Sequence, residues 1–366
     1  MKYAVGVDLG GTNIVTILMN ERGKIIARDK RPTEAFKGKN YVLKRIAEGI
    51  ETVLKCQVSH PTKLAGTASV KYQVSSIQHQ NLRSTFDVRL SPRLGFVETC
   101  GGRSTDIVGI GIGTPGLVDL DRGIVYEAPN IPGWDNVPLA KIYREKFGVP
   151  VFLENDANSA ALGEWWTGAG KGTKHMLCFT LGTGIGGGII IDGKVYHGAE
   201  GYAAELGHIS LSFDGPKCGC GNTGCMEAYA SAKGITERTR ALLKDKKNRK
   251  SLIYKLINGN SGKITPAVIT QAARKKDSLA VKIWKDTGYY LGSGIASYAN
   301  IFNPEIIVLT GGMTGAGKLL FKSMWETVHR RAFKGAVKNL KIVKGNLPDD
   351  AGAVGAAKTA FQRTIE

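Results

Sequence analysis

The feature that most constrains how this chain can fold is a group of three cysteines and one histidine within eighteen residues. The group consists of His208, Cys218, Cys220 and Cys225. Glycines stand between the cysteines and let the backbone turn tightly enough to bring three sulfurs around one ion. With His208 as the fourth ligand, protein fills every position of a tetrahedral ion, which is typical of structural rather than catalytic zinc. The sequence therefore predicts a structural Zn²⁺ site.

Other interpretations of the cysteine cluster are three unpaired thiols in a glycine-rich loop, or a disulfide between two of them. A chain without a secretory signal is expected in a reducing compartment, which favours zinc. A nucleic-acid zinc knuckle is a further alternative, although there is one cluster only, inside a large globular sequence. Of the other cysteines, Cys56 and Cys178 are expected as apolar core residues and Cys100 as a loop thiol.

Glutamates flank the cluster, because Glu205 precedes His208 by three residues and Glu227 follows Cys225 by two. The pattern Glu-x-Gly-His, followed by Cys-Gly-Cys-Gly-x-x-Gly-Cys-x-Glu, resembles the signature of the ROK family (repressors, open reading frames and kinases). The flanking sequence is similar to the bacterial glucokinases of that family. The resemblance implies that His208 both holds zinc and contacts a sugar, and that Glu205 and Glu227 bind sugar hydroxyls.

A candidate catalytic base follows a predicted strand at 149–153, where the chain reads Glu-Asn155-Asp156 ahead of a predicted helix at 159–166. A carboxylate at this place is commonly only a helix cap. The positive end of the helix would also keep the aspartate ionised, and a low pKa is no handicap for a base that accepts its proton late in phosphoryl transfer. By resemblance, Asp156 is this base and Asn155 binds a sugar hydroxyl.

Two segments share the pattern of a strand, a glycine-rich turn and a second strand. One turn follows a strand at 2–8 and the other follows a strand at 175–181. Amides exposed by such turns can bind phosphate oxygens, and a carboxylate at a strand end can orient Mg²⁺. The resemblance implies that ATP lies across both turns, as in actin-like sugar kinases. The residues expected at ATP and Mg²⁺ are Asp8, Gly10, Gly11, Thr12, Asn13, Gly182, Thr183 and Gly184.

Each turn also has another interpretation. The first equally fits a plain tight hairpin. The second contains Gly-x-Gly-x-x-Gly from Gly182 to Gly187, the pattern of dinucleotide-binding folds, but an apolar run follows where that fold requires a helix. The phosphate-binding role therefore depends on the repetition of the turn and on the resemblance.

Two further glycine turns belong to the predicted site. An apolar strand beginning near residue 106 runs into Gly-x-Gly-Thr-Pro-Gly, and by resemblance Gly113 in this turn lines the sugar site. A strand at 305–309 ends at Gly311 and Gly312, which by resemblance permit close approach of adenosine. Without the resemblance this second turn is an ordinary strand-to-helix connection.

The balance of charge bears on the partners. Fifty Lys and Arg against 31 Asp and Glu give a net charge of +19, which invites a nucleic-acid interpretation. Part of the excess lies at 244–250 and 274–276, where no aromatic residues alternate with the charges, so a solvated helix face is preferred. No run approaches the ~20 apolar residues of a membrane span, and a strand at residue 2 leaves no room for a targeting peptide. We expect a cytoplasmic protein without nucleic-acid or membrane partners.

Length and composition allow an α/β fold of two domains, because 366 residues with 42% hydrophobic content can bury a sizeable core. The repeated turns and the resemblance imply two actin-like (ribonuclease H-like) α/β domains with an interdomain cleft. We expect a smaller domain at 1–125, joined by a returning helix at 349–366, and a larger domain with the zinc motif at 126–348. Residues 61–105 interrupt the family pattern with a polar, basic segment that we expect to be poorly ordered.

The resemblance implies ATP-dependent phosphorylation of the 6-hydroxyl of a hexose, with glucose as the first choice. Fructose, mannose and N-acetylhexosamine kinases of the family are alternatives. A sugar-binding transcriptional regulator would need a DNA-binding helix-turn-helix before the first strand, where this chain begins, and a silent sugar sensor would not need Asp156. We expect a homodimer or higher homo-oligomer from the family's tendency to pair.

Overall fold

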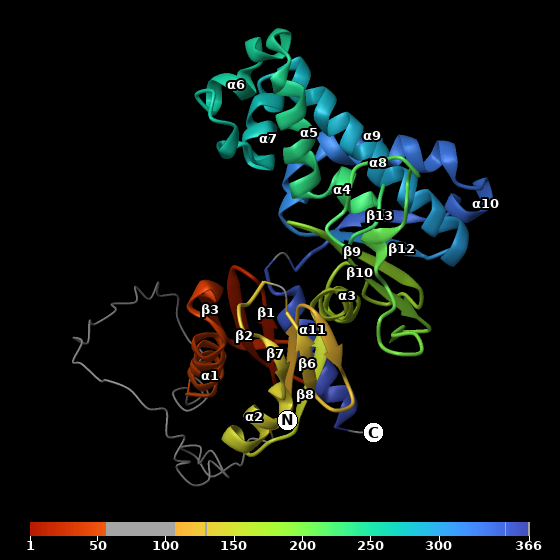
Figure 1. The fold of residues 1–366 in the computed structure, drawn as a ribbon. Coiled ribbons are helices and arrows are strands. Elements are labelled where there is room, and N and C mark those ends of the chain that lie inside the picture. The colour runs from red at the N-terminus through yellow and green to blue at the C-terminus, as the bar shows by residue number, and fades with distance from the viewer. Residues whose placement is uncertain (56–106, 129, 348, 365–366) are drawn as a thin grey trace, which may run out of the picture.

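The computed structural model describes residues 1–55, 107–128, 130–347 and 349–364 of the chain. These residues form two five-stranded mixed sheets and one small antiparallel sheet, with helices packed around them (Figure 1). The α/β fold class is therefore confirmed. The expected poor order of 61–105 lies outside the described residues, as do Cys56 and Cys100.

The first large sheet is built from the N-terminal strands and two later ones. Its order is β3 (Ile25–Pro32), β2 (Asn13–Asn20), β1 (Tyr3–Leu9), β4 (Ile107–Thr114) and β8 (Val151–Asn155). Strands β1 and β2 form an antiparallel hairpin that closes at the pair Leu9 and Ile14, and β4 and β8 continue parallel to β1. Because parallel neighbours end at the same edge, β1 and β8 deliver their last residues to one side of the sheet.

The second large sheet repeats this plan. Its order is β11 (Lys194–Val195), β10 (Ile185–Ile191), β9 (Met176–Leu181), β12 (Ile306–Thr310) and β13 (Lys341–Lys344). Strands β9 and β10 form the antiparallel hairpin, which closes at Leu181 and Ile185, and β12 and β13 run parallel to β9. The duplicated hairpin predicted from the sequence is thus confirmed as a duplicated sheet.

Helices cover one outer face of each sheet. The first sheet packs on α1 (Lys39–Lys55) and α2 (Leu139–Phe147), which the Tyr143 hydroxyl joins by donating to the Leu43 carbonyl. A group of helices covers the second sheet. It comprises α4 (Met226–Ala230), α5 (Ala232–Lys244), α6 (Leu252–Leu256), α7 (Pro266–Arg274), α8 (Ser278–Phe302), α9 (Lys318–Arg331) and α10 (Lys334–Val337).

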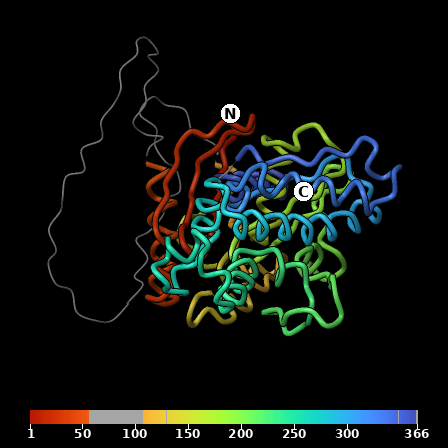
Figure 2. Tube along the Cα trace, turned by 90° about the horizontal axis from the view of Figure 1, so that it is seen from above, coloured from red at the N-terminus to blue at the C-terminus, as the bar shows by residue number. Residues whose placement is uncertain are grey.

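Two helices lie between the sheets, and each follows the last strand of one sheet and packs mainly on the other sheet. Helix α3 (Asp156–Trp166) follows β8 of the first sheet and packs on β9 and β10 of the second. Helix α11 (Ala351–Arg363) follows β13 of the second sheet and packs on β1 and β4 of the first, so the two ends of the chain lie side by side (Figure 2). The two helices cross closely, because a Cβ at Gly355 would overlap the Ser159 carbonyl.

Some elements differ from the sequence expectation. Three short strands that the sequence pattern did not indicate form the small sheet: β5 (Leu117–Asp119), β6 (Ile124–Glu127) and β7 (Asp135–Val137). After the cysteine cluster, α4 and α5 are separate helices, because the Ser231 backbone between them is extended and its side chain caps α5 by accepting from the Gly234 amide. Cys178 is buried, as predicted.

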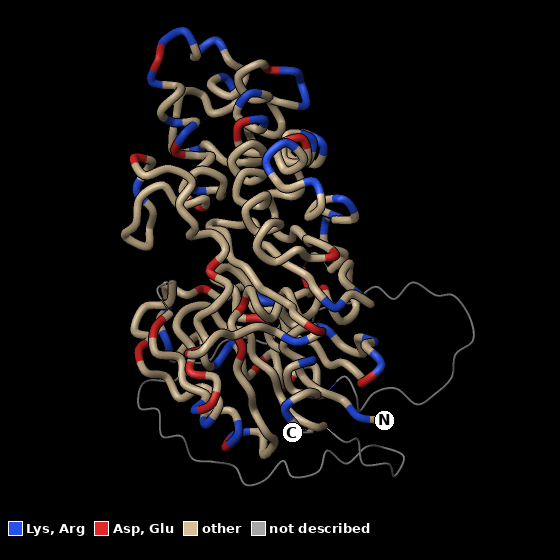
Figure 3. The backbone as a smooth tube through the Cα atoms, turned by 90° about the vertical axis from the view of Figure 1, so that its right-hand side faces the viewer, with Lys and Arg blue, Asp and Glu red and all other residues tan. Residues whose placement is uncertain are grey.

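The basic run interpreted as a solvated face is exposed in the structure. It forms a 3-10 helix, η4 (Lys246–Lys250), at the end of the molecule remote from the first sheet (Figure 3). Arg274 is also exposed, although its guanidinium donates to the Gly315 carbonyl at 3.1 Å. None of the helices described here combines the length and apolar character that a bilayer crossing requires.

Candidate active site and metal cluster

A cavity of about 750 Å³ opens where the end of β8, the β9–β10 turn and the loop before 3-10 helix η3 (Leu206–His208) meet. Most of the residues predicted from the sequence to contact a sugar line this cavity, together with part of the predicted nucleotide site. These residues are Asn155, Asp156, Gly182, Thr183, Gly184, Glu205, His208, Glu227 and Gly311. Residues from segments far apart in the sequence therefore share one cavity.

The start of α3 differs in detail from the expectation. The helix begins at Asp156, three residues earlier than predicted, and Asn155 is its cap: the Asn155 Oδ1 accepts from the amides of Ala157 and Asn158. The residue that caps the helix is therefore Asn155, and not Asp156 as the alternative interpretation of the sequence had it. Because the Asn155 oxygen is engaged, its amide nitrogen is the atom left to donate to a ligand.

The charge state of Asp156 also differs from the expectation. Its Oδ1 accepts from the Ala157 amide at 2.8 Å, as the start of a helix favours. Burial nevertheless raises the pKa of this carboxyl, and the charge of Glu205 adds to the rise. The low pKa expected from the sequence was wrong, because that expectation included the helix end and left out the desolvation of the side chain.

Asp8 lies beside this carboxylate, at the end of β1. Burial, followed by the charges of Asp156 and Asp350, raises the pKa of Asp8 from 3.8 to about 7. The carboxyl group packs against the first turn of α11, since a Cβ at Gly352 would lie 2.5 Å from the Asp8 Cγ. A cation near Asp8 would offset the unfavourable effect of burial and of the two neighbouring carboxylates on its ionised form.

The two glycine turns are held in similar ways. In each loop the first amide donates across the turn: Gly10 to the Asn13 carbonyl and Gly182 to the Gly184 carbonyl, each at 3.0 Å. In the second turn, the carbonyls of Gly182 and Thr183 accept from the first amides of α5. Since carbonyl and amide point in opposite directions across a planar peptide, the amides of Thr183 and Gly184 face away from α5.

Glu227 connects the second turn to the cysteine loop. Its Oε2 accepts from the Ile185 amide at 2.9 Å, and its Oε1 lies 3.5 Å from the Cys218 Sγ. The carboxylate also packs so closely below Gly184 that a Cβ there would overlap it. A displacement of the cysteine loop would therefore move Glu227 and the turn together.

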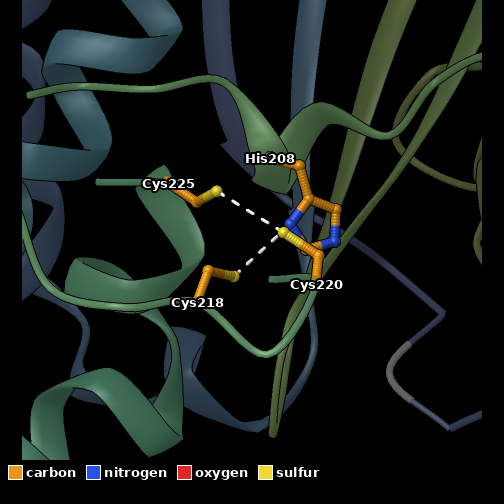
Figure 4. A group of neighbouring side chains, drawn as sticks. All are labelled: His208, Cys218, Cys220 and Cys225. Carbon is orange, nitrogen blue, oxygen red and sulfur yellow. Dashed lines mark hydrogen bonds between the residues drawn. The ribbon is translucent and has the colours of Figure 1, made fainter. Parts of the chain in front are cut away.

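The four predicted metal ligands converge. Their ligand atoms all lie within 4.8 Å of one another (Figure 4). The Sγ atoms of Cys220 and Cys225 are 3.7 Å apart, and the Cys218 Sγ is 3.6 Å from the His208 Nδ1. Tetrahedral zinc with its usual bond lengths would place such pairs about 3.8 Å and about 3.6 Å apart. The donor set and its spacing fit a zinc ion.

The imidazole of His208 joins this cluster to the cavity. With Nδ1 facing the Cys218 sulfur, the Nε2 atom lies 3.8 Å from the Glu205 carboxylate. Glu205 is two-thirds exposed, and the residue before it, Ala204, has a φ of +71°, which side-chain-bearing residues rarely adopt. The loop that presents Glu205 is thus held in a strained conformation by its surroundings.

Some predicted residues lie outside the cavity lining. Gly113 is buried with its α-carbon against Ser159 of α3, and the next residues of its turn, Pro115 and Gly116, line the cavity instead. The first turn, with Gly10, Gly11, Thr12 and Asn13, is at the margin, where Gly11 approaches Asn130.

A second cavity, of about 480 Å³, lies beyond Gly312. The helix α7 forms its other wall, and Thr270 and Gln271 are among the lining residues. The sequence predicted that Gly312 contributes to the adenosine site, but it did not predict that α7 forms the opposite wall. The apolar pattern of a helix does not indicate which other segment of the chain the helix will face. Arg274 and Lys275, interpreted only as solvated charges, stand at the rim of this cavity.

Three comparisons with known proteins agree with one another. The sequence profile of the ROK family matches residues 94–363. The chain is 37% identical to a glucokinase of Thermotoga maritima over 98% of this chain and 97% of the relative. It is also 36% identical to a xylose repressor of Caldicellulosiruptor bescii, over 68% of this chain and 61% of the repressor.

A solved structure has the same fold over almost the whole length. A ROK family glucokinase from Streptomyces griseus, crystallised with glucose and AMPPNP, superimposes with a TM-score of 0.72 at 31% identity, covering 98% of this chain and 99% of that one. The family match, the full-length relative and the shared fold all carry the same conclusion. The chain belongs to the ROK family.

Proposed function

We propose that this protein transfers the γ-phosphoryl group of ATP to the 6-hydroxyl of glucose. The observation that carries the proposal is the convergence on one cavity of Asp156, the sugar-type residues and a phosphate-type glycine turn. The glucokinase name of a relative 37% identical over its full length supports glucose as the substrate. The solved relative holds glucose and an ATP analogue together, which supports ATP as the donor.

The sugar is held at the end of β8 and by the loop before η3. The Asn155 amide nitrogen donates to one hydroxyl, since its oxygen is engaged as the helix cap. Glu205 and Glu227 accept from other hydroxyls, and the His208 Nε2 contacts the sugar beside Glu205. These groups together fix the sugar ring with its primary hydroxyl at Asp156.

Asp156 accepts the proton of the attacking hydroxyl. A carboxylate orients this oxygen and takes up the proton as the bond to phosphorus forms. The raised pKa of the buried carboxyl suits this role, because a base whose pKa is nearer to neutrality holds the proton better. The proton then leaves to solvent when the site opens.

ATP lies across both glycine turns, with its adenosine in the cavity beyond Gly312. The amides of Thr183 and Gly184 bind phosphate oxygens, and those of Gly10, Gly11, Thr12 and Asn13 serve the same group from the first turn. Asp8 fits a divalent cation, because desolvation and the charges of Asp156 and Asp350 disfavour its ionised form, which a cation would stabilise. Mg²⁺ bound there would offset the charge of the phosphates.

The cysteine cluster holds a structural zinc ion. His208 with Cys218, Cys220 and Cys225 supplies four protein ligands, so the ion would keep no position for a substrate. Its contribution is to fix the ring of His208 and the loop that carries it.

We propose the division into a smaller domain at 1–125 with the helix at 349–366, and a larger domain at 126–348. The packing of α11 on β1 and β4 supports the inclusion of the C-terminal helix in the first domain. Closure of the two domains over the substrates would exclude water, which otherwise competes as acceptor. Since ATP is the donor, the reaction belongs to the cytoplasm, and we expect a homodimer, which light scattering would detect.

The test is a coupled ADP-release assay with purified protein, ATP, Mg²⁺ and a panel of hexoses. We expect glucose to give the highest kcat/KM among glucose, fructose, mannose and N-acetylhexosamines. A preference for another hexose would change the proposed substrate but leave the proposed phosphoryl transfer unchanged. Binding of a sugar without turnover would instead favour a sugar-responsive regulator, the second candidate, which the similarity to a xylose repressor brings forward.

A further inference from the structure

Glu154 is a buried acid that the proposed reaction does not use. It stands in β8 immediately before Asn155 and Asp156, and its side chain is 4% exposed. Both carboxylate oxygens are engaged: Oε1 accepts from the Asn155 amide at 3.0 Å and from the Asn158 side chain at 3.3 Å, and Oε2 lies 2.8 Å from the His197 Nε2. Glu154 therefore braces the turn that presents the proposed base.

His197 comes from the other side of the cavity. It follows β11 of the second sheet and begins the loop that leads through Ala204 to Glu205. The loop closes on itself, because the Ala203 amide donates to the His197 carbonyl at 3.0 Å. A displacement of His197 would therefore also displace Ala203 and the strained residue Ala204, which precedes Glu205.

The contact joins a carboxylate to an imidazole nitrogen at 2.8 Å. The hydrogen bond with Glu154 raises the pKa of His197, although burial and the charge of Arg363 oppose the rise. Within the described ranges, no lysine or arginine lies at ion-pair distance from the Glu154 carboxylate, so His197 is the basic side chain that pairs with it. A buried carboxylate that loses such a partner is left uncompensated at a high cost in free energy.

The remaining surroundings of His197 are mixed in charge. Its ring, one-third exposed, faces a cavity of about 660 Å³ next to the proposed sugar site. The charged groups that line this cavity are Asp119, Asp121, Lys194, Glu200 and Arg363. Arg363 is itself engaged, since it donates to the Leu120 carbonyl and to Asp121. The direct pairing of Glu154 with His197 links β8 of the first sheet to the loop that follows β11 of the second.

We propose that Glu154 and His197 are positioning residues, which hold the Glu205 loop against the end of β8 so that Glu205 and Asp156 face one sugar. The proposal rests on the proposed sugar-kinase function and adds to it the contact that aligns the two halves of the sugar site. Neither residue touches substrate in this account. The effect of the pair is therefore expected in sugar affinity more than in the chemical step.

The test compares His197→Ala and His197→Gln with the parent protein in the ADP-release assay. His197→Ala should raise the KM for glucose roughly tenfold or more, the effect of losing a charged hydrogen bond. It should leave the KM for ATP within about twofold, since the phosphate turns are held by other contacts. His197→Gln should recover part of the loss, because its amide can still donate to Glu154.

A matched control is His175→Ala. His175 lies just before a strand of the second sheet and also pairs with a carboxylate, Asp192 at 3.6 Å, but at an exposed site away from the cavity. This variant should retain the KM for glucose of the parent. Its retention would show that the loss in His197→Ala does not follow from removing any histidine ion pair.

A second pair of variants keeps the test independent of folding. Glu154→Gln alone and with His197→Ala should change the KM for glucose less than additively, because His197→Ala already removes the contact that Glu154→Gln weakens. Additive effects, an unchanged KM in His197→Ala, or equal losses toward both substrates with a lowered Tm would each overturn the proposal. If the parent phosphorylates no hexose, the proposed function fails first and the positioning role falls with it; an active parent with an indifferent His197 overturns the positioning role alone.

Discussion

The two large sheets have the same strand order and the same hairpin, yet they carry different chemistry. In the first sheet the residue next to the closing pair of the hairpin is Asp8, opposite Val15; in the second sheet it is Thr180, opposite Gly186. The helices that follow the last strands also correspond. Helix α3 begins with Asp156, whereas α11 begins with Ala351 after Asp350, which pairs with Arg28 at 2.7 Å. The two halves thus share one backbone arrangement but carry different side chains at corresponding positions.

The connections differ even more than the strands. Between the third and fourth strands of the first sheet the structure describes α1, while the second sheet inserts the cysteine cluster and a series of helices at the corresponding place. The glycine turns proposed to bind phosphate are common to both halves, whereas the side chains proposed to bind the sugar lie at the start of α3 and in the insertion of the second sheet. In the proposed function, the repeated scaffold therefore binds the group that many reactions share, and the insertion selects the substrate.

The largest effect is expected from the difference between the starts of α3 and α11. Asp156→Asn should lower kcat by roughly 10²–10⁴-fold, the range for loss of a positioned base, while sugar binding is retained. Asp350→Asn at the corresponding place should lower kcat far less, because its carboxylate pairs with Arg28. Single-turnover rates and calorimetric binding of glucose would measure both. Comparable rates for the two variants would show that the halves do not differ in this way.

The second prediction concerns the cluster that only the second half carries among the described residues. Cys220→Ser should remove zinc, measured by elemental analysis, and abolish most of the activity, because His208 and Glu227 lose their support. Cys178→Ala, which changes a buried cysteine outside the cluster, should keep the zinc content of the parent. Full activity without metal would contradict the proposed role of the cluster.

The third prediction compares the two hairpins directly. Asp8→Asn should lower kcat and weaken the dependence of the rate on Mg²⁺, whereas Thr180→Val in the second hairpin should have a much smaller effect, because only Asp8 lies beside the carboxylates of Asp156 and Asp350. The rate measured over a Mg²⁺ titration would separate the variants. Equal changes in the two would mean that the hairpins contribute alike.

Asp8 also makes stability depend on pH. Its pKa is raised from 3.8 to about 7, so the native state binds this proton more tightly than the unfolded state does. The free energy of unfolding should therefore fall as the pH rises through this interval without Mg²⁺, by at most about 1.4 kcal/mol for each pH unit. Asp8→Asn should remove that part of the fall. Urea unfolding at several pH values would measure the difference, and identical pH profiles would contradict it.

The smallest effect is expected from the charge of Glu205 on Asp156. Because burial raises the pKa of Asp156, kcat should decline toward acid pH, as the base becomes protonated, before an ordinary aspartate would. Glu205 adds to this rise, so Glu205→Gln should move the acid limb of the kcat profile to lower pH. A limb that stays in place would show that another group titrates.

Much of this site could be predicted from the sequence because its signals are local. The four cluster residues lie within eighteen positions, so their spacing indicated a metal site, and each glycine turn stands between two apolar strands, where its repetition and the family resemblance indicated phosphate binding. Features that depend on packing between distant segments gave no such signal. The pKa of Asp156 depends on burial, and the partner of Glu154 lies 43 positions away, so neither could be read from the order of residues.

Two of the missed residues carried a faint local signal. Glu154 stands in an apolar strand, where a charge needs a partner, and His197 lies in a glycine-rich loop just ahead of the Glu205 segment. Each pattern indicates that the charged or polar side chain needs a partner, but not which residue supplies it. The small sheet at 117–137 was missed for a related reason, because strands of three or four residues are too short to show a period.

The place of α11 has a consequence for how the chain matures during translation. The face of the first sheet formed by Ala4, Ile17 and Met19 is covered by Ala353, Ala357 and Phe361, which come much later in the chain. A ribosome adds roughly 5–20 residues per second, so the earliest strands wait many seconds with an apolar face open to water. The core of the first sheet is therefore completed only after α11 has been synthesised, and nascent chains stalled before residue 351 should engage chaperones at that face.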